Sequence, residues 1–315
     1  MQNLSERVVV LGTGGTIAGS AERAADTLGY RAGQIPAARL VEDIVALAGG
    51  PIEAQQIAQI DSKDMVDEVW LALAQAVHTQ LERPDVAGVV VTHGTDTLEE
   101  TAYFLQRVLA PSRPVVLVGA MRPATSLQAD GPQNLCDAVQ VARSRGARGV
   151  VAVLAGTVYS AWDVRKVHPY RLEAFDAGDA GPVARLEAGR LRMLRDWPVG
   201  QALGLPALRR EGGAWPWVEI LTSHAGARAA AVSAWVAGGV RGIVVAGTGN
   251  GSVHAALEGA LVDARAAGVV VWRSTRCQNG EVLDAGPVAL PSAGTLTPVQ
   301  ARIELMLRLS AGIAA

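Results

Sequence analysis

Residues 88–105 read GVVVTHGTDTLEETAYFL. The valine run between Gly88 and Thr92 has no polar alternation, which predicts a short strand buried on both faces. From Leu98 to Leu109 the apolar residues recur at spacings of three or four, which predicts a helix with one apolar stripe. A buried strand, a glycine-containing loop and an amphipathic helix in this order are typical of a mostly parallel α/β sheet.

The same alternation extends to both sides of that unit. Further strands are predicted at Val8–Leu11, Ala54–Ile60, Val115–Val118 and Val150–Leu154. Further helices are predicted at Ala37–Ala48, Met65–Leu81 and Asn134–Ala142. We therefore expect a larger N-terminal α/β domain, residues 1–194, whose mostly parallel sheet is flanked by helices.

The alternation breaks after about residue 190. Residues 195–216 contain three prolines and several glycines without a sustained period, which indicates an ordered linker. A second, smaller α/β domain is predicted for residues 217–315. Its strands are expected at Val218–Leu221, Gly242–Ala246 and Val269–Trp272, and its helices at Ala227–Ala237, Val253–Ala267 and Pro298–Leu309.

Composition argues against several classes of function. The 315 residues include 28 basic and 30 acidic side chains, so the net charge of −2 offers no basic surplus for a nucleic-acid backbone. The longest uncharged apolar run, Ala229–Val240, is shorter than the roughly 20 residues that span a bilayer. Cys136 and Cys277 are too few for a disulfide framework or a cysteine zinc site. We therefore expect neither nucleic acid nor a membrane as partner, and no metal.

The N-terminal run and the basic residues add two expectations. Val8–Gly12 is too short and too glycine-rich for the core of a signal peptide, so we expect a cytoplasmic protein. Among the 28 basic residues only Lys63 and Lys166 are lysine. A bias toward arginine at every other basic position makes these two lysines candidates for specific roles.

Glycine-rich and polar loops follow the predicted strands, at the edge where open α/β sheets bind ligands. The loop Gly12–Gly19 reads GTGGTIAG, and it fails as a dinucleotide fingerprint because Ile17 stands where a glycine is required. By itself this loop is a glycine-rich turn. The tips Asp61–Asp64 and Gly119–Pro123 add polar groups to the same predicted edge.

The loop after Thr92 carries a distinct polar pattern. Asp96 is expected to cap the following helix, with Thr95 as the alternative, and Glu99 stands at capping-box spacing. Capping does not explain why a hydroxyl and a carboxylate stand side by side directly after Gly94. With free backbone N–H groups at a helix N-terminus, this pair favours a ligand site.

The sequence contains none of the common catalytic signatures. It has no G-x-S-x-G elbow, no P-loop and no H-E-x-x-H motif. The five histidines are scattered, and His93, at the end of a buried strand, is expected to be a hydrogen-bonded core residue rather than a base or ligand. A hydrolase with this sequence therefore needs another nucleophile, and an activated threonine is the available type.

Two segments, TGGTIAG at Thr13–Gly19 and THGTDTLEETAYFL at Thr92–Leu105, resemble the signature segments of the bacterial-type L-asparaginase family. Members of that family hydrolyse asparagine to aspartate and ammonia. Five further motifs match the family in order, at Val118–Pro123, Ala129–Leu135, Asp163–Lys166, Gly247–Gly251 and Ala293–Arg302. The resemblance covers the chain throughout and implies a two-domain α/β hydrolase without a cofactor, most of whose catalytic residues lie in the N-terminal domain.

The resemblance assigns catalytic roles residue by residue. Thr16 matches the nucleophile, and Tyr30 is the tyrosine available to hydrogen-bond it. Thr95, Asp96 and Lys166 match a second set that faces the same substrate. The implied reaction is acyl transfer to Thr16, loss of ammonia, and attack by a water molecule held by Thr95. Backbone N–H groups of the adjoining turn would stabilise the oxyanion.

Substrate contacts follow from the charges of an amino acid, which presents a carboxylate and an ammonium. Ser62 matches a carboxylate contact, and Asp96 and Glu281 match ammonium contacts. The remaining substrate-contact positions are Lys63, Gly94 and Ala120.

In this family the late acidic residue comes from a neighbouring subunit. The resemblance therefore implies an intimate homodimer that assembles into a homotetramer. Because the spacing around Glu281 is one residue off the family pattern, Asp284 is the alternative for this contact.

Three positions depart from the family pattern. Lys63 stands where other members have a Gln or Glu that helps hold the substrate ammonium, and lysine cannot accept a hydrogen bond. Ser252 replaces a second asparagine of some members, and Arg165 replaces a small hydroxyl residue. These departures leave the activity toward glutamine open.

Three hypotheses of function follow from the sequence. The favoured one is an L-asparaginase with weaker glutaminase activity. The second is a glutaminase-type subunit of a tRNA amidotransferase, and the third is a non-catalytic amino-acid-binding or nucleotide-binding protein on the same fold. Turnover of asparagine separates the first from the third.

Overall fold

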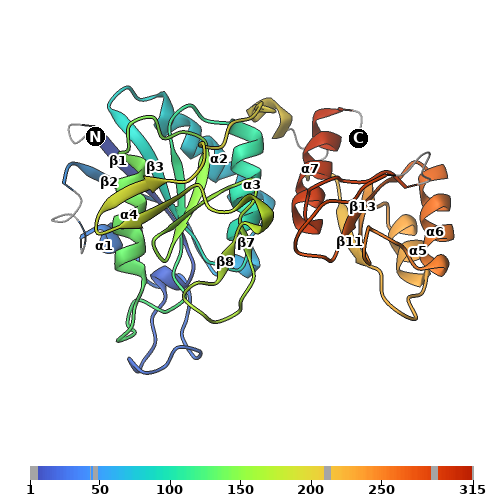
Figure 1. Cartoon of the computed structure of the whole chain (residues 1–315), viewed down its shortest axis with the longest axis horizontal. Helices are drawn as coiled ribbons and strands as arrows, with labels where there is room; N and C mark the ends of the chain where they lie inside the picture. Colours follow the sequence, from blue (N-terminus) through green and yellow to red (C-terminus); the bar gives the residue numbers. More distant parts are fainter. Residues whose placement is uncertain (1–5, 43, 45–48, 209–213, 285–289, 314–315) are drawn as a thin grey trace. The chain divides into compact units, whose positions relative to one another are not determined.

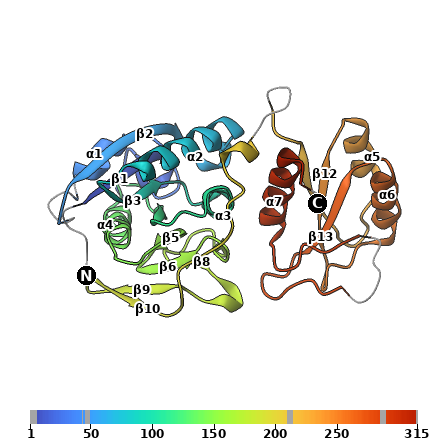
Figure 2. The same ribbon diagram turned by 90° about the horizontal axis from the view of Figure 1, so that it is seen from above.

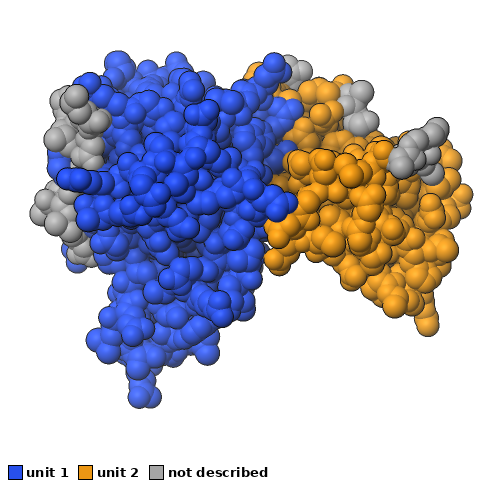
Figure 3. Space-filling view, viewed as in Figure 1, with its two compact units in different colours: residues 1–202 blue, residues 203–315 orange. Residues whose placement is uncertain are grey.

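The computed structural model describes residues 6–42, 44, 49–208, 214–284 and 290–313. The chain forms two compact units, residues 1–202 and residues 203–315 (Figures 1 and 3). The division falls inside the segment for which the sequence predicts a linker, and the finer boundaries at 194 and 217 stay predictions. Each unit is an α/β structure with a sheet of its own, as the sequence predicts.

The larger unit is built on an eight-stranded sheet of order β10-β9-β6-β5-β4-β3-β1-β2. Its parallel strands are β1 (Arg7–Gly14), β2 (Ile52–Ile60), β3 (Val86–Thr92), β4 (Val115–Val118) and β5 (Val150–Leu154). All five predicted strands of this unit are confirmed. The β-branched residues of β1, β3, β4 and β5 are buried from water on both sides, which explains the absence of polar alternation in these four strands. Strand β2 lies at the edge of the sheet, and its residues are only partly buried or exposed.

Three antiparallel strands extend the sheet beyond β5. They are β6 (Thr157–Ser160), β9 (Ala184–Glu187) and β10 (Arg190–Met193). A separate two-stranded sheet joins β7 (Arg165–Lys166) to β8 (Phe175–Asp176). The sequence does not predict these elements, because each is only two to four residues long and the outer ones carry charged side chains.

Helices cover both faces of the large sheet (Figure 2). The face with α1 (Ala37–Glu42) and α4 (Gly131–Ala142) holds a core of valines from β1, β3, β4 and β5. The other face is covered by α2 (Asp67–Glu82) and α3 (Leu98–Leu109). These last two helices contact each other through Trp70 and Phe104, whose rings stack at 5.0 Å. The predicted continuation of the first helix, residues 43 and 45–48, lies outside the described residues.

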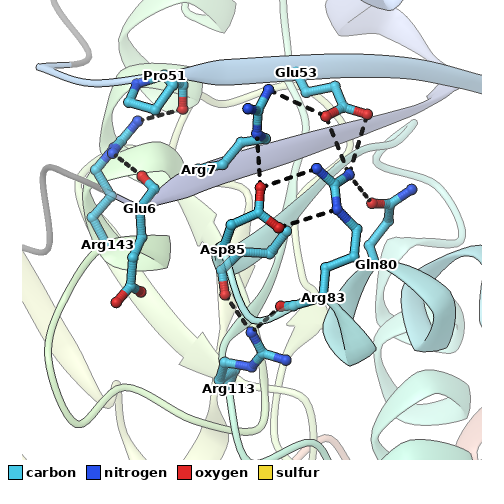
Figure 4. A network of polar contacts seen from close by, with 10 residues as sticks. Glu6, Arg7, Pro51, Glu53, Gln80, Arg83, Asp85, Arg113 and Arg143 are labelled. Carbon is cyan, nitrogen blue, oxygen red and sulfur yellow. Dashed lines mark hydrogen bonds and ion pairs between the residues drawn. The ribbon is translucent and has the colours of Figure 1, made fainter.

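A network of polar contacts ties together the amino ends of β1, β2 and β3 (Figure 4). Arg83 pairs with Glu53 at 3.1 Å and with Asp85 at 3.2 Å, and Arg7 pairs with the same two carboxylates. The guanidinium of the buried Arg143 donates to two carbonyl groups, each at 2.8 Å. The network thus occupies the edge of the sheet opposite to the one where the sequence predicts a ligand site.

The smaller unit has a parallel sheet of order β11-β12-β13. The strands are β11 (Val218–Thr222), β12 (Gly242–Gly247) and β13 (Val270–Thr275), and the helices are α5 (Ala230–Ala237), α6 (Ala255–Ala266) and α7 (Pro298–Ala311). A capping box of Thr297 and Gln300 starts α7, which packs on one face, while α5 and α6 cover the other (Figure 2). Among the described residues, no helix is both long and apolar enough to cross a membrane.

Candidate active site

Three loops meet at the carboxyl edge of the large sheet because glycines allow their backbones to touch. Gly15, with a φ of +79°, lies so close to the loop after β3 that a Cβ on it would stand 2.2 Å from the Gly94 nitrogen. A Cβ on Gly94 would in turn stand 2.4 Å from the Ser62 hydroxyl. The loops after β1, β2 and β3 therefore converge, and the glycines that precede Thr16 and Thr95 touch through their backbones.

Thr16 begins a short 3-10 turn, Thr16–Ala18, and its side chain is buried. Its Oγ1 lies 2.7 Å from the hydroxyl oxygen of Tyr30. The chain between them loops out and returns, because Ser20 and Arg31 exchange two backbone hydrogen bonds of 2.9 Å. The structure thus brings together the two residues that the sequence pairs as nucleophile and hydroxyl partner.

Lys166 links the second predicted set. Its ammonium donates to Thr95 Oγ1 at 2.9 Å and to Asp96 Oδ1 at 2.6 Å. The Lys166 side chain is 16% exposed and that of Asp96 is 57% exposed, so the pair points from the interior toward solvent. A hydroxyl that accepts from an ammonium in this way is polarised and fixed in orientation.

The prediction that Asp96 or Thr95 caps α3 is wrong. Thr97 is the N-cap residue, and its hydroxyl donates to the Ser62 carbonyl at 2.8 Å instead of capping the helix. Asp96 stands one residue before the N-cap position, and its carboxylate accepts from the Lys166 ammonium instead. Glu99 likewise leaves the capping box and accepts a hydrogen bond from the Lys166 backbone N–H at 2.6 Å.

His93 is a buried, hydrogen-bonded core residue, as the sequence predicts. Burial lowers the pKa of its imidazole to about 4, so the ring is neutral at neutral pH. Because Gly94 offers only a carbonyl, 2.7 Å away, the Nδ1 atom must carry the proton. Nε2 then accepts from the Thr101 hydroxyl at 2.9 Å, and that hydroxyl accepts from Trp70 Nε1 at 2.8 Å. This series of hydrogen bonds fixes the position of the Gly94 carbonyl group.

Ser62 and Lys63 differ in their surroundings. The Ser62 hydroxyl is buried and has no hydrogen-bond partner among the described residues. Lys63 is 61% exposed, and its ammonium is held by Asp61 at 2.9 Å and Asp64 at 3.0 Å. Hydrogen bonds to these two carboxylates raise the pKa of Lys63. Ser62 is thus an unsatisfied donor inside the site, whereas Lys63 is engaged by its own loop.

The loop after β4 completes this edge. Ala120 is fully buried, and a Cβ on the preceding Gly119 would stand 3.0 Å from Thr95 Cγ2. Sequence reasoning missed two residues that hold this loop. Asp130 accepts from the Met121 and Arg122 amides at 3.0 and 2.9 Å, and Asn134 donates to the Gly119 carbonyl at 3.0 Å. Their spacing in the motif Ala129–Leu135 was the available signal.

A second missed group anchors the segment that carries Tyr30. The guanidinium of the buried Arg122 lies 4.1 Å from the centre of the Tyr170 ring and donates to the Tyr170 carbonyl at 2.9 Å. The Tyr170 hydroxyl lies 2.9 Å from the Thr27 hydroxyl. The loop after β4 therefore reaches the Tyr30 segment through one arginine and one tyrosine.

The acidic residues predicted for the neighbouring subunit lie in the unit of residues 203–315. Asp284 forms an ion pair with Arg273 and accepts from the Ser292 hydroxyl at 2.9 Å. Glu281 is exposed and makes no hydrogen bond or ion pair within the described ranges. The structure thus gives Asp284 an internal structural role and leaves the Glu281 carboxylate available.

Comparisons with known proteins show the family of the chain. Residues 7–199 match the family described as Asparaginase, N-terminal, and residues 217–314 match the Glutaminase/Asparaginase C-terminal domain. The chain belongs to the asparaginase family. The residues predicted from the resemblance to that family, except Glu281 and its alternative Asp284, lie at the carboxyl edge described above or on the segments that adjoin it.

Relatives within the family cover nearly the whole chain. The probable periplasmic L-asparaginase of Haemophilus influenzae is 38% identical, over 96% of this chain and 88% of its own. The glutaminase-asparaginase of Pseudomonas fluorescens is 37% identical, over 87% of this chain and 76% of its own. The crystal structure of a probable cytoplasmic L-asparaginase from Campylobacter jejuni superposes with a TM-score of 0.91 at 36% identity, covering 97% of this chain and 95% of that one.

The contact between Gly15 and Gly94 predicts a steric penalty for any side chain. Gly15→Ala is expected to lower the free energy of unfolding by about 2–5 kcal/mol, because a positive φ and an overpacked contact add. Gly146 is the matched control, since its φ is +81° and a Cβ there would have no neighbouring atom within 4 Å. Gly146→Ala should cost only about 1–2 kcal/mol in denaturant unfolding. Equal losses in the two variants would contradict the contact.

The series of hydrogen bonds that links Trp70, Thr101, His93 and Gly94 predicts a stability effect of its own. Thr101→Val keeps the side-chain volume and leaves the buried His93 Nε2 without its donor. We expect a loss of about 1–3 kcal/mol in the free energy of unfolding. Thr79→Val, on the exposed surface of α2, is the control and should change it by less than about 0.5 kcal/mol. A neutral Thr101→Val would show that this series of hydrogen bonds contributes nothing.

Proposed function

We propose that the protein is an L-asparaginase, an amidohydrolase that converts L-asparagine to L-aspartate and ammonia through a threonine acyl-enzyme. The observation that supports the proposal is the close approach of Gly15 and Gly94, which precede the hydrogen-bonded Thr16 of one set and Thr95 of the other. The names of the Haemophilus influenzae relative and the Campylobacter jejuni neighbour point to the same reaction. A weaker glutaminase activity is included, because the Pseudomonas fluorescens relative is a glutaminase-asparaginase.

The reaction begins with attack of Thr16 Oγ1 on the side-chain amide carbon of asparagine. The Tyr30 hydroxyl acts as a relay: it accepts the proton of Thr16 while it gives up its own proton, which passes to the leaving nitrogen as the C–N bond breaks and ammonia departs. The negative charge on the carbonyl oxygen is stabilised by backbone N–H groups of the turn at Thr95, whose preceding carbonyl is fixed by His93. A water molecule held by Thr95 then hydrolyses the ester, and the proton that it releases returns to Thr16.

Recognition of the substrate uses its two charged groups. The unsatisfied Ser62 hydroxyl donates to the α-carboxylate. Asp96 binds the α-ammonium on one side, and Glu281 of a neighbouring copy binds it on the other. This arrangement requires a homodimer, and we propose that two such dimers form a homotetramer. Lys63 contributes only through the electrostatic field of its loop, because Asp61 and Asp64 hold its ammonium.

We also propose a cytoplasmic location. The Campylobacter jejuni neighbour is named as a probable cytoplasmic enzyme, whereas the Haemophilus influenzae relative is named as periplasmic. Both cysteines, Cys136 and Cys277, are free thiols, which suits a reducing compartment. Cell fractionation followed by an asparaginase assay on each fraction tests this location.

Removal of the hydroxyl groups at the site should abolish the reaction. We expect Thr16→Ala and Thr95→Val each to lower kcat by about 10⁴-fold or more, and Tyr30→Phe by about 10²–10⁴-fold. The measurement is ammonia release from L-asparagine and L-glutamine in separate assays. Thr79→Val is the control for a threonine outside the site. Ammonia release at the wild-type rate by Thr16→Ala would refute Thr16 as nucleophile.

Mixing of variants tests whether Glu281 acts across a subunit boundary. Glu281→Gln should raise KM for asparagine about tenfold or more, because a charge-assisted contact is lost. When Thr16→Ala and Glu281→Gln proteins are unfolded and refolded together at equal amounts, half of the dimers contain both. One site in each such dimer is intact, so about a quarter of wild-type kcat/KM should return.

The outcome of mixing is decisive for the identity of the contact. No recovery in the mixture would place Glu281 in the same subunit as the site or outside it. Asp284→Asn is the matched control, and we expect it to change stability through Arg273 and to leave KM unaltered. A rise in KM for Asp284→Asn with an unchanged Glu281→Gln would assign the contact to Asp284.

A further inference from the structure

Glu99 is a half-buried carboxylate that neither helix capping nor the proposed catalytic roles explain. It stands in the first turn of α3, and its Oε2 accepts a hydrogen bond from the backbone N–H of Lys166 at 2.6 Å. It also lines a cavity of about 410 Å³ together with Asp96, Lys166 and His168. Glu99 therefore holds the backbone of the residue whose ammonium contacts Thr95.

The backbone of Lys166 needs such an anchor. Strand β7 has only two residues and pairs with another strand of two residues, so its register is weakly held by ladder hydrogen bonds. Glu99 fastens this strand to α3, the helix that begins just after Thr95 and Asp96. The Lys166 ammonium and its two acceptors, Thr95 and Asp96, are thereby all held relative to the same helix, α3.

We propose that Glu99 is a positioning residue for Lys166, because its carboxylate fixes the backbone from which the lysine side chain reaches Thr95 and Asp96. The ionisation state of the Glu99 carboxyl group controls how firmly the Lys166 backbone is held. The inference rests on the proposed function, since Lys166 acts there on Thr95. Glu99 touches no reacting atom. Its effect should therefore fall on kcat, while KM for asparagine, which depends on Ser62, Asp96 and Glu281, stays nearly unchanged.

The charges around Glu99 set the pH range of this control. Burial raises the pKa of Glu99 to about 7, against the opposing backbone hydrogen bond from Lys166. Glu100 adds to the increase, whereas the positive charges of Arg165 and Lys166 oppose it. Asp96 and His168 face the same cavity.

The ionised form should be the active one. An ionised carboxylate accepts a charge-assisted hydrogen bond, which is roughly twice as strong as one to a neutral group. A protonated Glu99 therefore holds Lys166 less firmly. It follows that wild-type kcat/KM should rise with pH with a midpoint near 7, since this parameter reports groups of the free enzyme.

The test compares the pH profiles of kcat/KM for wild type and Glu99→Gln between pH 5.5 and 9. Glutamine keeps an oxygen acceptor for the Lys166 N–H and cannot ionise, so the rise near pH 7 should disappear and the rate should stay near that of the protonated wild type. Glu99→Ala removes the acceptor altogether, and we expect kcat to fall about tenfold to hundredfold at every pH with KM changed less than about twofold. A Glu99→Gln profile that keeps the wild-type rise would overturn the proposal.

Two control variants test which residue causes the rise of kcat/KM near pH 7. A histidine ordinarily titrates near neutrality, and His168 Nδ1 accepts from the Tyr170 and Arg171 amides at 3.0 and 2.9 Å. His168→Asn keeps an acceptor for this turn and removes the imidazole, and it should retain the rise. Loss of the rise in His168→Asn, with its retention in Glu99→Gln, would transfer the control to His168. Glu82→Gln makes the same chemical change at an exposed position and should match wild type.

A readout independent of catalysis separates this inference from the proposed function. Because the pKa of Glu99 is raised in the folded state, its stabilising contribution is complete below its ordinary value of 4.5 and is lost as the pH rises through about 7. The decrease of Tm across this interval should be shallower in Glu99→Gln than in wild type or Glu82→Gln. Equal slopes in the three proteins would overturn the assignment of the titrating group. Wild-type protein that releases no ammonia would instead refute the proposed function while the Tm comparison stands.

Discussion

The close approach of Gly15 and Gly94 determines where every other group of the site can lie. Strands β1 and β3 are neighbours in the sheet, and Gly12 pairs with Thr92 in their register, so the loops that follow leave the same edge side by side. Only two residues without Cβ allow the loops to touch through their backbones. Thr16 and Thr95 each follow one of these glycines directly, and the distance between the two hydroxyl-bearing loops is thus set by backbone contact.

The two lysines of the chain show how the same charge takes different roles in different surroundings. Lys166 is 16% exposed and divides its hydrogen bonds between a hydroxyl and one carboxylate. Lys63 is 61% exposed, and its ammonium forms ion pairs with two carboxylates of its own loop. An ammonium is a compact point charge on a flexible stem, so it can bridge two acceptors of different geometry where the planar fork of arginine is less suited. At Lys166 this property serves the site, and at Lys63 it serves a surface loop.

Much of this structure could be predicted from sequence because the strands and helices of the central sheet obey simple periodicity. The valine-rich β3 and the stripe on α3 are examples in which local pattern and tertiary burial agree. The short strands β7 and β8 carry no such pattern, and they exist because tertiary contacts such as that of Glu99 hold them. The cap of α3 was mispredicted for the same reason: Asp96 has a partner 70 positions away that no local rule reveals. Asp130 and Asn134 were missed because they contact loop backbone and touch no predicted catalytic residue except through it.

The site combines the tightly packed residues around Thr95 with the loosely packed segment that carries Tyr30. Thr95 lies between buried strands and a buried helix, and the series of hydrogen bonds through His93 fixes the peptide before it. Tyr30 comes from the segment of residues 20–32, all of which the structure describes and none of which is buried. That segment is held by a few contacts, such as the Thr27–Tyr170 hydroxyl pair, which are exposed to water. Local opening free energy follows buried contacts, so Tyr30 can separate from Thr16 at a small fraction of the cost of moving Thr95. We therefore expect Thr95, which is proposed to hold the attacking water, to stay in place when Tyr30 separates from Thr16.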